Sequence, residues 1–128
     1  MFKRYFLVIA AALSLGAAAV FAGEAAGTDK TATAPMRQYV IEREIPGAGK
    51  MTAQELRAAA AKSNAVLHEL GPDIQWVQSY VAGDKLYCIY NARSADLIKR
   101  HAARSGFPAN RITPVAVVIN PTTANPSP

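Results

Sequence analysis

The stretch Ile74-Gln-Trp-Val-Gln-Ser-Tyr-Val-Ala-Gly-Asp-Lys-Leu-Tyr-Cys-Ile-Tyr90 decides the fold, because it reads as two strands joined by a turn. Residues 74–81 and 85–90 are rich in aromatic and β-branched side chains, which is typical of strands. Gly83-Asp84 between them suits a tight turn. Strict alternation along the first strand would place these side chains on one face of the sheet: Ile74, Trp76, Gln78 and Tyr80. The sequence therefore predicts a β-hairpin in the middle of the domain.

A strand and a helix are predicted before this hairpin. Residues 37–45 alternate between apolar and charged side chains, which indicates a half-buried strand. Thr52-Ala-Gln-Glu55 is a capping box, because the threonine oxygen can accept from the Glu55 amide while the glutamate carboxylate reaches back. Apolar residues then recur at helical spacing as far as Leu70, and Gly71-Pro72 ends the helix.

A second helix and a last strand are predicted after the hairpin. Ser94 can cap a helix that ends near Gly106. The apolar face of this helix holds Leu97, Ile98, His101 and Ala102. Residues 112–119 read as a strand, and Pro114 indicates an edge position because proline lacks a backbone donor.

The order of the predicted elements is β-α-β-β-α-β, which is the ferredoxin-like pattern of an α+β fold. Right-handed crossovers would place both helices on one face of an antiparallel sheet. The opposite face would then be bare, although tyrosine, tryptophan and aliphatic residues alternate along the strands. We therefore expect two copies to pack face to face as a homodimer of the α+β barrel type.

Residues 1–22 are predicted to be a secretory signal peptide, because two basic residues precede an uncharged apolar run that ends in small side chains. An uncleaved anchor is the alternative, since the run 5–22 is just long enough to span a bilayer. Residues 23–36 are expected to be a disordered linker and 121–128 a disordered proline-rich tail. Residues 37–120 would form the single domain. We expect a periplasmic or secreted protein without a stable membrane anchor after cleavage.

Charge and motifs exclude several functions. The chain has 14 Lys and Arg against 9 Asp and Glu, but the basic residues are scattered, which argues against a nucleic-acid partner. The single cysteine excludes a disulfide framework. No serine-hydrolase elbow, CxxC, HExxH or phosphate-binding loop is present. No sequence motif therefore indicates catalysis, and whether the protein is an enzyme is not decided by the sequence.

Three residues are candidates for chemistry, and each has a structural alternative. Cys88 is either a small buried hydrophobe or a thiolate ligand, and a lone thiol is unusual in an exported protein. His101 is either a hydrogen-bonded core residue or a neutral imidazole ligand. Glu42, with Glu44 beside it, is either a solvent-facing charge or part of an acid–base pair.

Four strings together resemble a family of small, mostly bacterial proteins of largely unknown function, whose named members are called nickel-binding or nickel-responsive. The strings are Tyr39–Gly47, Ile74–Val81, Lys85–Tyr90 and His101–Asn110. The resemblance implies a ferredoxin-like fold, a homodimer and binding of Ni(II) or another divalent transition metal. His101, Cys88 and Glu42 would then supply one nitrogen, one sulfur and one oxygen ligand, a set that suits late first-row metals.

Our first functional hypothesis is therefore an exported, dimeric metal-binding protein without catalysis. A second is a small-molecule-binding or enzymatic protein that uses a pocket near His101 and Tyr90. A third is a purely structural or interaction module.

Overall fold

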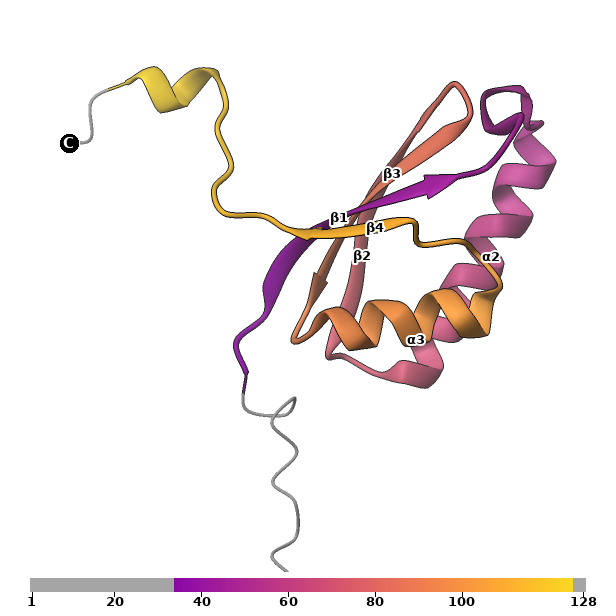
Figure 1. Cartoon of the computed structure of the whole chain (residues 1–128), viewed down its shortest axis with the longest axis horizontal. Helices are drawn as coiled ribbons and strands as arrows, with labels where there is room; N and C mark the ends of the chain where they lie inside the picture. Colours follow the sequence, from indigo (N-terminus) through magenta and orange to yellow (C-terminus); the bar gives the residue numbers. More distant parts are fainter. Residues whose placement is uncertain (1–33, 126–128) are drawn as a thin grey trace, which may run out of the picture.

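The computed structural model describes residues 34–125, which form a four-stranded sheet, two long helices and two short 3-10 helices (Figure 1). The elements in chain order are β1 (Arg37–Glu44), η1 (Ala48–Lys50), α2 (Ala53–Leu70), β2 (Ile74–Ala82), β3 (Lys85–Ala92), α3 (Ala95–Ser105), β4 (Arg111–Pro114) and η2 (Pro121–Ala124). The predicted signal peptide, 1–22, and most of the predicted linker, 23–36, lie outside the described residues.

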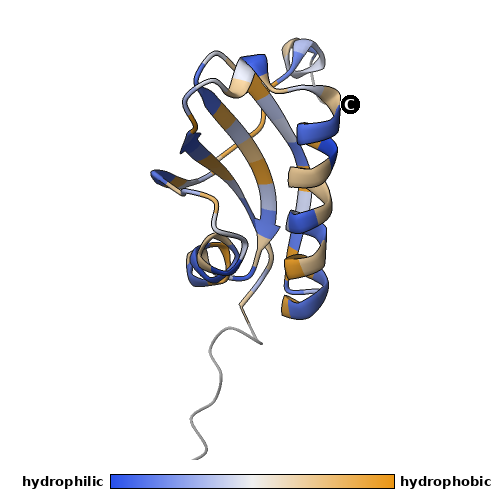
Figure 2. Cartoon of the chain, turned by 90° about the vertical axis from the view of Figure 1, so that its right-hand side faces the viewer, coloured by the Kyte–Doolittle hydropathy of each residue, from blue (hydrophilic) through white to orange (hydrophobic). Residues whose placement is uncertain are grey.

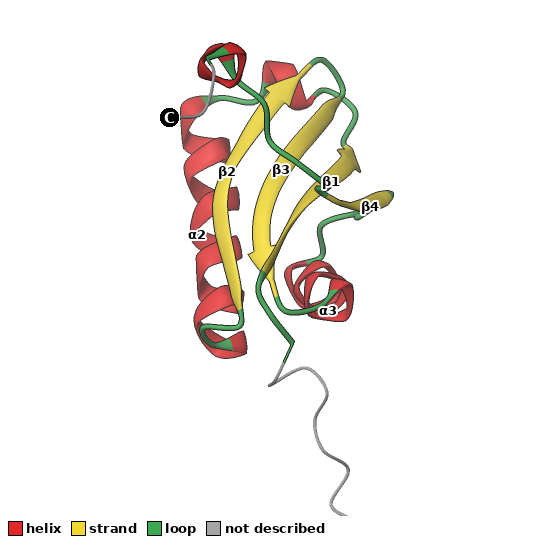
Figure 3. Ribbon diagram, turned by 90° about the vertical axis from the view of Figure 1, so that its left-hand side faces the viewer, coloured by secondary structure: helices red, strands yellow, loops and turns green. Residues whose placement is uncertain are grey.

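The strands are ordered β2-β3-β1-β4, and every neighbouring pair is antiparallel. The connection through α2 crosses over β3, and the connection through α3 crosses over β1. Both α2 and α3 therefore lie on one side of the sheet, and Figure 3 shows the opposite side, which neither of them covers. The predicted α+β ferredoxin-like fold is confirmed.

The hydrophobic core lies between the helices and the sheet. Its buried members are Tyr39, Ile41, Ile74, Cys88, Tyr90, Ala92, Leu97 and Ile98. Figure 2 shows hydrophobic bands recurring along the strands beside the helices. Ile41 and Ile98 are completely buried, and burial of such a side chain contributes roughly 1.5–3 kcal/mol to stability.

Both helices begin where their capping residues predict. The Thr52 hydroxyl accepts from the Glu55 amide, and the Glu55 carboxylate accepts from the Thr52 amide, so the capping box is formed. Ser94 accepts from the Leu97 amide at the start of α3. That helix ends at Gly106, whose φ of 73° lies in the left-handed region that favours glycine.

Strand β2 departs from the predicted strict alternation. The register against β3 shifts between Trp76 and Gln78, which marks a β-bulge around Val77. One extra residue in a strand turns every later side chain to the opposite face. Trp76 therefore shares the helix-facing side with Ser79, and the prediction that it shares a face with Gln78 and Tyr80 is wrong.

Strand β4 is shorter than the predicted 112–119. Its ladder ends at Pro114, and the Val115 amide donates one more bond to the Gln38 carbonyl at 2.8 Å. Residues 116–120 then leave the sheet in extended form (Figure 1). Three large side chains of this segment are exposed: Val117, Val118 and Ile119. We call residues 115–119 the C-terminal arm.

The structure describes short parts of the two flanking segments, at residues 34–36 and 121–125. At the end of the linker, the Arg93 guanidinium donates to the Ala34 carbonyl at 2.6 Å. In the predicted tail, Pro121–Ala124 form η2, because the Asn120 side chain caps this turn. Within residues 34–125, no helix combines the length and apolar character needed to cross a membrane.

Candidate functional site

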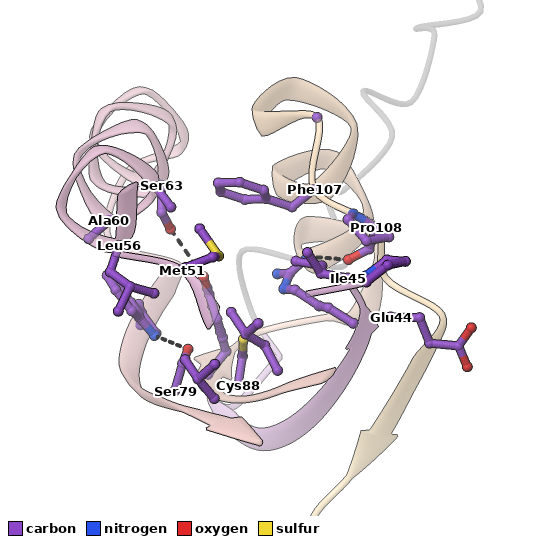
Figure 4. A pocket seen from close by; sticks show the side chains of 18 residues that line it. Glu44, Ile45, Met51, Leu56, Ala60, Ser63, Ser79, Cys88, Phe107 and Pro108 are labelled. Carbon is purple, nitrogen blue, oxygen red and sulfur yellow. Dashed lines mark hydrogen bonds between the residues drawn. The ribbon is translucent and has the colours of Figure 1, made fainter. Parts of the chain in front are cut away.

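A cavity of about 500 Å³ lies between α2 and the helix-facing side of the sheet (Figure 4). Figure 4 shows its walls, with Leu56, Ala60 and Ser63 on one side, Phe107 and Pro108 on the other, and Ser79 and Cys88 below. Ala59 and Ala60 line it from α2, where larger side chains would occupy the space. The cavity thus exists because α2 presents small residues to this part of the sheet.

The β-bulge in β2 shapes one wall of the cavity. Trp76, Ser79 and Val81 all line it, although strict alternation would have turned Ser79 and Val81 away from Trp76. The indole nitrogen of Trp76 donates to the Ser79 hydroxyl at 2.9 Å. This bond fixes the indole against the wall and satisfies its polar group, as a half-buried tryptophan requires.

A buried arginine lines the same cavity. Arg43 on β1 is 2% exposed, and its Nη1 donates to the Pro108 carbonyl at 2.6 Å. Its guanidinium carbon lies 6.0 Å from the Tyr90 ring centroid and 5.9 Å from that of Phe107, within cation–π range. Its Nη2 is buried and has no hydrogen-bond partner among residues 34–125. An unsatisfied cationic donor therefore lies buried in the wall of the cavity.

A hydrogen-bonded group of three side chains lies beside this arginine. The Ser63 hydroxyl on α2 is 3.2 Å from the Tyr90 hydroxyl on β3 and 3.1 Å from Nε2 of His101 on α3. Tyr90 and Ser63 line the cavity. His101 is completely buried, and in the described part of the chain its Nδ1 has no partner.

Burial keeps both ring systems of this group uncharged at neutral pH. Desolvation is the main cause that lowers the pKa of His101, and the positive charge of Arg43 lowers it further. Desolvation is also the main cause that raises the pKa of Tyr90, although Ser63 and Arg43 oppose it. The Tyr90 hydroxyl therefore keeps its proton at neutral pH.

The three predicted metal ligands do not meet within one chain. Cys88 pairs in register with Ile41 and faces the helices. His101 is buried on α3, the helix that packs on this side of the sheet. Glu42 pairs with Tyr87 on the other side and lies 4.0 Å from the Arg111 Nε. No three His, Cys, Asp or Glu residues within 34–125 gather closely enough to hold a metal ion. The predicted three-ligand set is therefore wrong for a single chain, because Glu42 and Cys88 point to opposite faces.

Arg43 and Ser63 were not among the predicted site residues. The sequence does carry a signal for Arg43, since alternation puts it on the apolar side of β1 with Tyr39 and Ile41. A charged residue at a core-facing position is uncommon unless it has a partner or a function. Ser63 lies within the apolar stripe of α2, which is the same kind of signal.

Residues 39–115 match a protein family described as nickel responsive protein SCO4226-like. The chain belongs to the SCO4226-like family. This confirms the resemblance that the four sequence strings carry. Among curated proteins, no match is found.

The fold of this SCO4226-like chain is similar to that in the crystal structure of SCO4226 from Streptomyces coelicolor A3(2). The TM-score is 0.54 at 22% sequence identity, and the match covers 64% of this chain and 99% of the other. At this level of identity the likeness supports the fold alone.

Proposed function

We propose that this protein binds a small, largely apolar molecule in the cavity between α2 and the sheet. The proposal rests mainly on a cavity of about 500 Å³ with apolar walls and a few polar groups. One of these groups is Nη2 of Arg43, which has no hydrogen-bond partner among residues 34–125. Ligand pockets of globular proteins are typically about 300–1,000 Å³ and have this mixture of apolar lining and sparse polar groups.

The walls come from segments far apart in the chain, which makes the cavity a product of the whole fold. Met51 precedes α2, and Leu56 lies in the first turn of that helix. The strands of the hairpin contribute Trp76 and Cys88, and the segment after α3 contributes Phe107. Aromatic and sulfur-containing side chains adapt well to an apolar ligand. This cavity supports the second hypothesis from the sequence, a pocket near His101 and Tyr90. Tyr90 lines it, whereas His101 is not among the lining residues.

The single tryptophan of the chain, Trp76, reports directly on this cavity, because it lines the wall. The test adds 2-naphthylmethanol, a neutral apolar probe, to the protein purified after expression of the full chain. We expect a saturable change in Trp76 fluorescence. Ala60→Phe would fill the cavity and weaken binding at least about tenfold, whereas Ala58→Phe on the exposed side of α2 would not. Equal binding by both variants, or no response at all, would contradict the proposal.

Nickel binding is a second candidate, and the description of the family as nickel responsive supports it. The residues of one chain do not assemble a full site, so nickel would need further ligands from a second copy or from solvent. His101 and Cys88 are the residues that would take part, since the imidazole is kept neutral and both lie on the helix-facing side.

Calorimetric titration with Ni(II), Cu(II) and Zn(II) tests this candidate. A His101→Ala, Cys88→Ala double variant should lose most of the affinity, and Glu42→Gln should lose little because it lies on the other face. Absence of binding at micromolar metal, or full binding by the double variant, would remove nickel from consideration.

Export and dimerisation complete the proposal. The charge pattern of residues 1–22 supports a cleaved leader and a periplasmic or secreted location. The uncovered sheet face and the arm form an apolar groove that supports a homodimer; its lining includes Val40, Val77, Tyr80, Ile89, Val117 and Val118. Mass spectrometry of the protein from the expressing cells gives the mature N-terminus, which we expect at Gly23.

A further inference from the structure

We infer that the molecule bound in the cavity carries one carboxylate group and that Arg43 binds it. This inference rests on the proposed small-molecule function and adds the charge and chemical class of the ligand. Arg43 is 2% exposed and lines the cavity. An arginine side chain stays protonated at every physiological pH, so a full positive charge lies inside the domain.

No group within residues 34–125 neutralises this charge. No carboxylate there forms an ion pair with Arg43. Glu44 is the nearest acid in sequence, but its carboxylate points away from the cavity (Figure 4) and lies 3.9 Å from the Lys85 ammonium. Glu42 lies on the opposite face of the sheet. A buried charge without a partner is costly, and an anionic ligand would supply the missing partner.

Within residues 34–125, only one of the two terminal nitrogens of Arg43 has a hydrogen-bond partner, so the other is the candidate donor to a ligand. The Pro108 carbonyl accepts from Nη1 at 2.6 Å, which fixes the guanidinium, while Nη2 is buried without a hydrogen-bond partner in that part of the chain. The planar guanidinium matches a carboxylate well. The Tyr90 hydroxyl lies on the same cavity wall, 3.2 Å from its hydrogen-bond partner, the Ser63 hydroxyl.

The rest of the lining determines the class of anion. Arg43 is the single cation among the residues that line the cavity, and aromatic and aliphatic side chains surround it, among them Trp76, Phe107 and Leu86. One charge balances a carboxylate, whereas a phosphate monoester carries about −1.5 to −2 at neutral pH. An apolar or aromatic monocarboxylate therefore fits this cavity better than a phosphate ester.

The test compares three probes of nearly equal shape: 2-naphthylacetate, 2-naphthylacetamide and 2-naphthyl phosphate. Binding is followed by Trp76 fluorescence and by calorimetry on the protein expressed from the full chain. We expect the carboxylate to bind at least about tenfold more tightly than the amide, as a charge-assisted bond predicts. The phosphate should bind more weakly than the carboxylate.

Substitutions of Arg43 separate its role from that of the cavity. Arg43→Met should abolish the preference for the carboxylate and leave amide binding within about threefold of the wild type. Arg57→Met, at an exposed position on α2, is the control for net charge and should keep the preference. Thermal melting checks that the variants fold. If the Arg43→Met variant is unstable, Arg43→Lys takes its place in the test. It keeps the charge but lacks the planar guanidinium, so it should retain part of the preference for the carboxylate.

Each outcome has a distinct meaning. Equal affinity of the wild type for carboxylate and amide would overturn the inference and leave the proposed binding function standing. Tighter binding of the phosphate would also overturn the assignment of a monocarboxylate. Failure of all three probes to bind would overturn both proposals. A preference that survives in the Arg43→Met variant would show that another group binds the anion.

Discussion

The rings of Tyr90 and His101 lie 5.4 Å apart between centroids, and both residues hydrogen-bond to the hydroxyl of Ser63. The three side chains come from β3, α3 and α2. One small polar group therefore joins the sheet to both helices at the edge of the cavity. The arrangement also places the neutral imidazole behind the cavity wall, where it supports Tyr90 through Ser63.

Removing the Ser63 hydroxyl should be costly. Ser63→Ala leaves two buried groups, the Tyr90 hydroxyl and the His101 Nε2, without this partner, and the cost of such a loss is about 1–3 kcal/mol of unfolding free energy. Urea denaturation measures it, with Asn64→Ala at the next, exposed position of α2 as the control. Equal stability of the two variants would contradict the role given to this hydroxyl.

His101 should make the folded protein less stable in weak acid. Burial, and then the charge of Arg43, lower the pKa of His101 in the folded state, while Tyr90 beside it is uncharged. In the unfolded chain the imidazole titrates near about 6.5. As the pH falls below that value, the unfolded state binds a proton that the folded state does not, so the free energy of unfolding decreases. The decrease ends once the pH is below the folded-state pKa.

Urea midpoints between about pH 7.5 and pH 5 measure this effect above the range where carboxylates titrate. His101→Gln can still hydrogen-bond Ser63 but does not titrate, so its midpoint should change less over this range. His68→Gln, at an exposed position of α2, should behave like the wild type. The explanation fails if His101→Gln and the wild type lose stability in parallel.

Gly49→Ala should destabilise the protein, although its backbone needs no left-handed conformation. A Cβ at Gly49 would lie 3.0 Å from the Gly83 carbonyl oxygen, and the Gly49 amide donates to that same oxygen at 2.7 Å. A glycine-to-alanine change at a compatible site usually stabilises by about 0.4–1 kcal/mol. Here the crowding should reverse the sign and cost about 1–3 kcal/mol. A higher thermal midpoint for Gly49→Ala would show that the hairpin turn moves aside easily.

Charging the C-terminal arm should prevent the proposed dimer. Val117 and Ile119 are 74% and 75% exposed in a single chain, which leaves much apolar surface for a second copy to cover. Sedimentation should show a dimer for the wild type and a monomer for a Val117→Glu, Ile119→Glu variant. Ala103→Glu, on the exposed side of α3, should remain dimeric. A monomeric wild type at micromolar concentration would refute the proposed assembly.

The helix starts and the element order were predictable because their causes are local. Thr52 and Glu55 form a capping box from residues three apart, and Ser94 caps α3 in the same way. The position of His101 on the buried face of α3 also follows from helical spacing alone. The last strand was predicted too long, because the apolar arm has strand-like composition but lies beyond Pro114, where the chain leaves the β1 ladder.

The site depends on contacts between segments far apart in the sequence. The bulge at Val77 places Trp76 and Ser79 on the same wall of the cavity. No local pattern in the sequence of β2 predicts this bulge. Strand register likewise decides that Glu42 and Cys88 point to opposite faces, because a shift of one residue exchanges the two sides of a strand.

The sequence by itself determined the order of the strands and long helices along the chain, the caps of both helices and the buried faces of β1 and α3, since these follow from side-chain spacing and short-range hydrogen bonds. Only the tertiary structure decided that Arg43 lies beside an open cavity with a donor left over. That depends on how α2, the sheet and the Pro108 segment pack together, and packing distances between distant segments are not encoded in any one stretch of the chain.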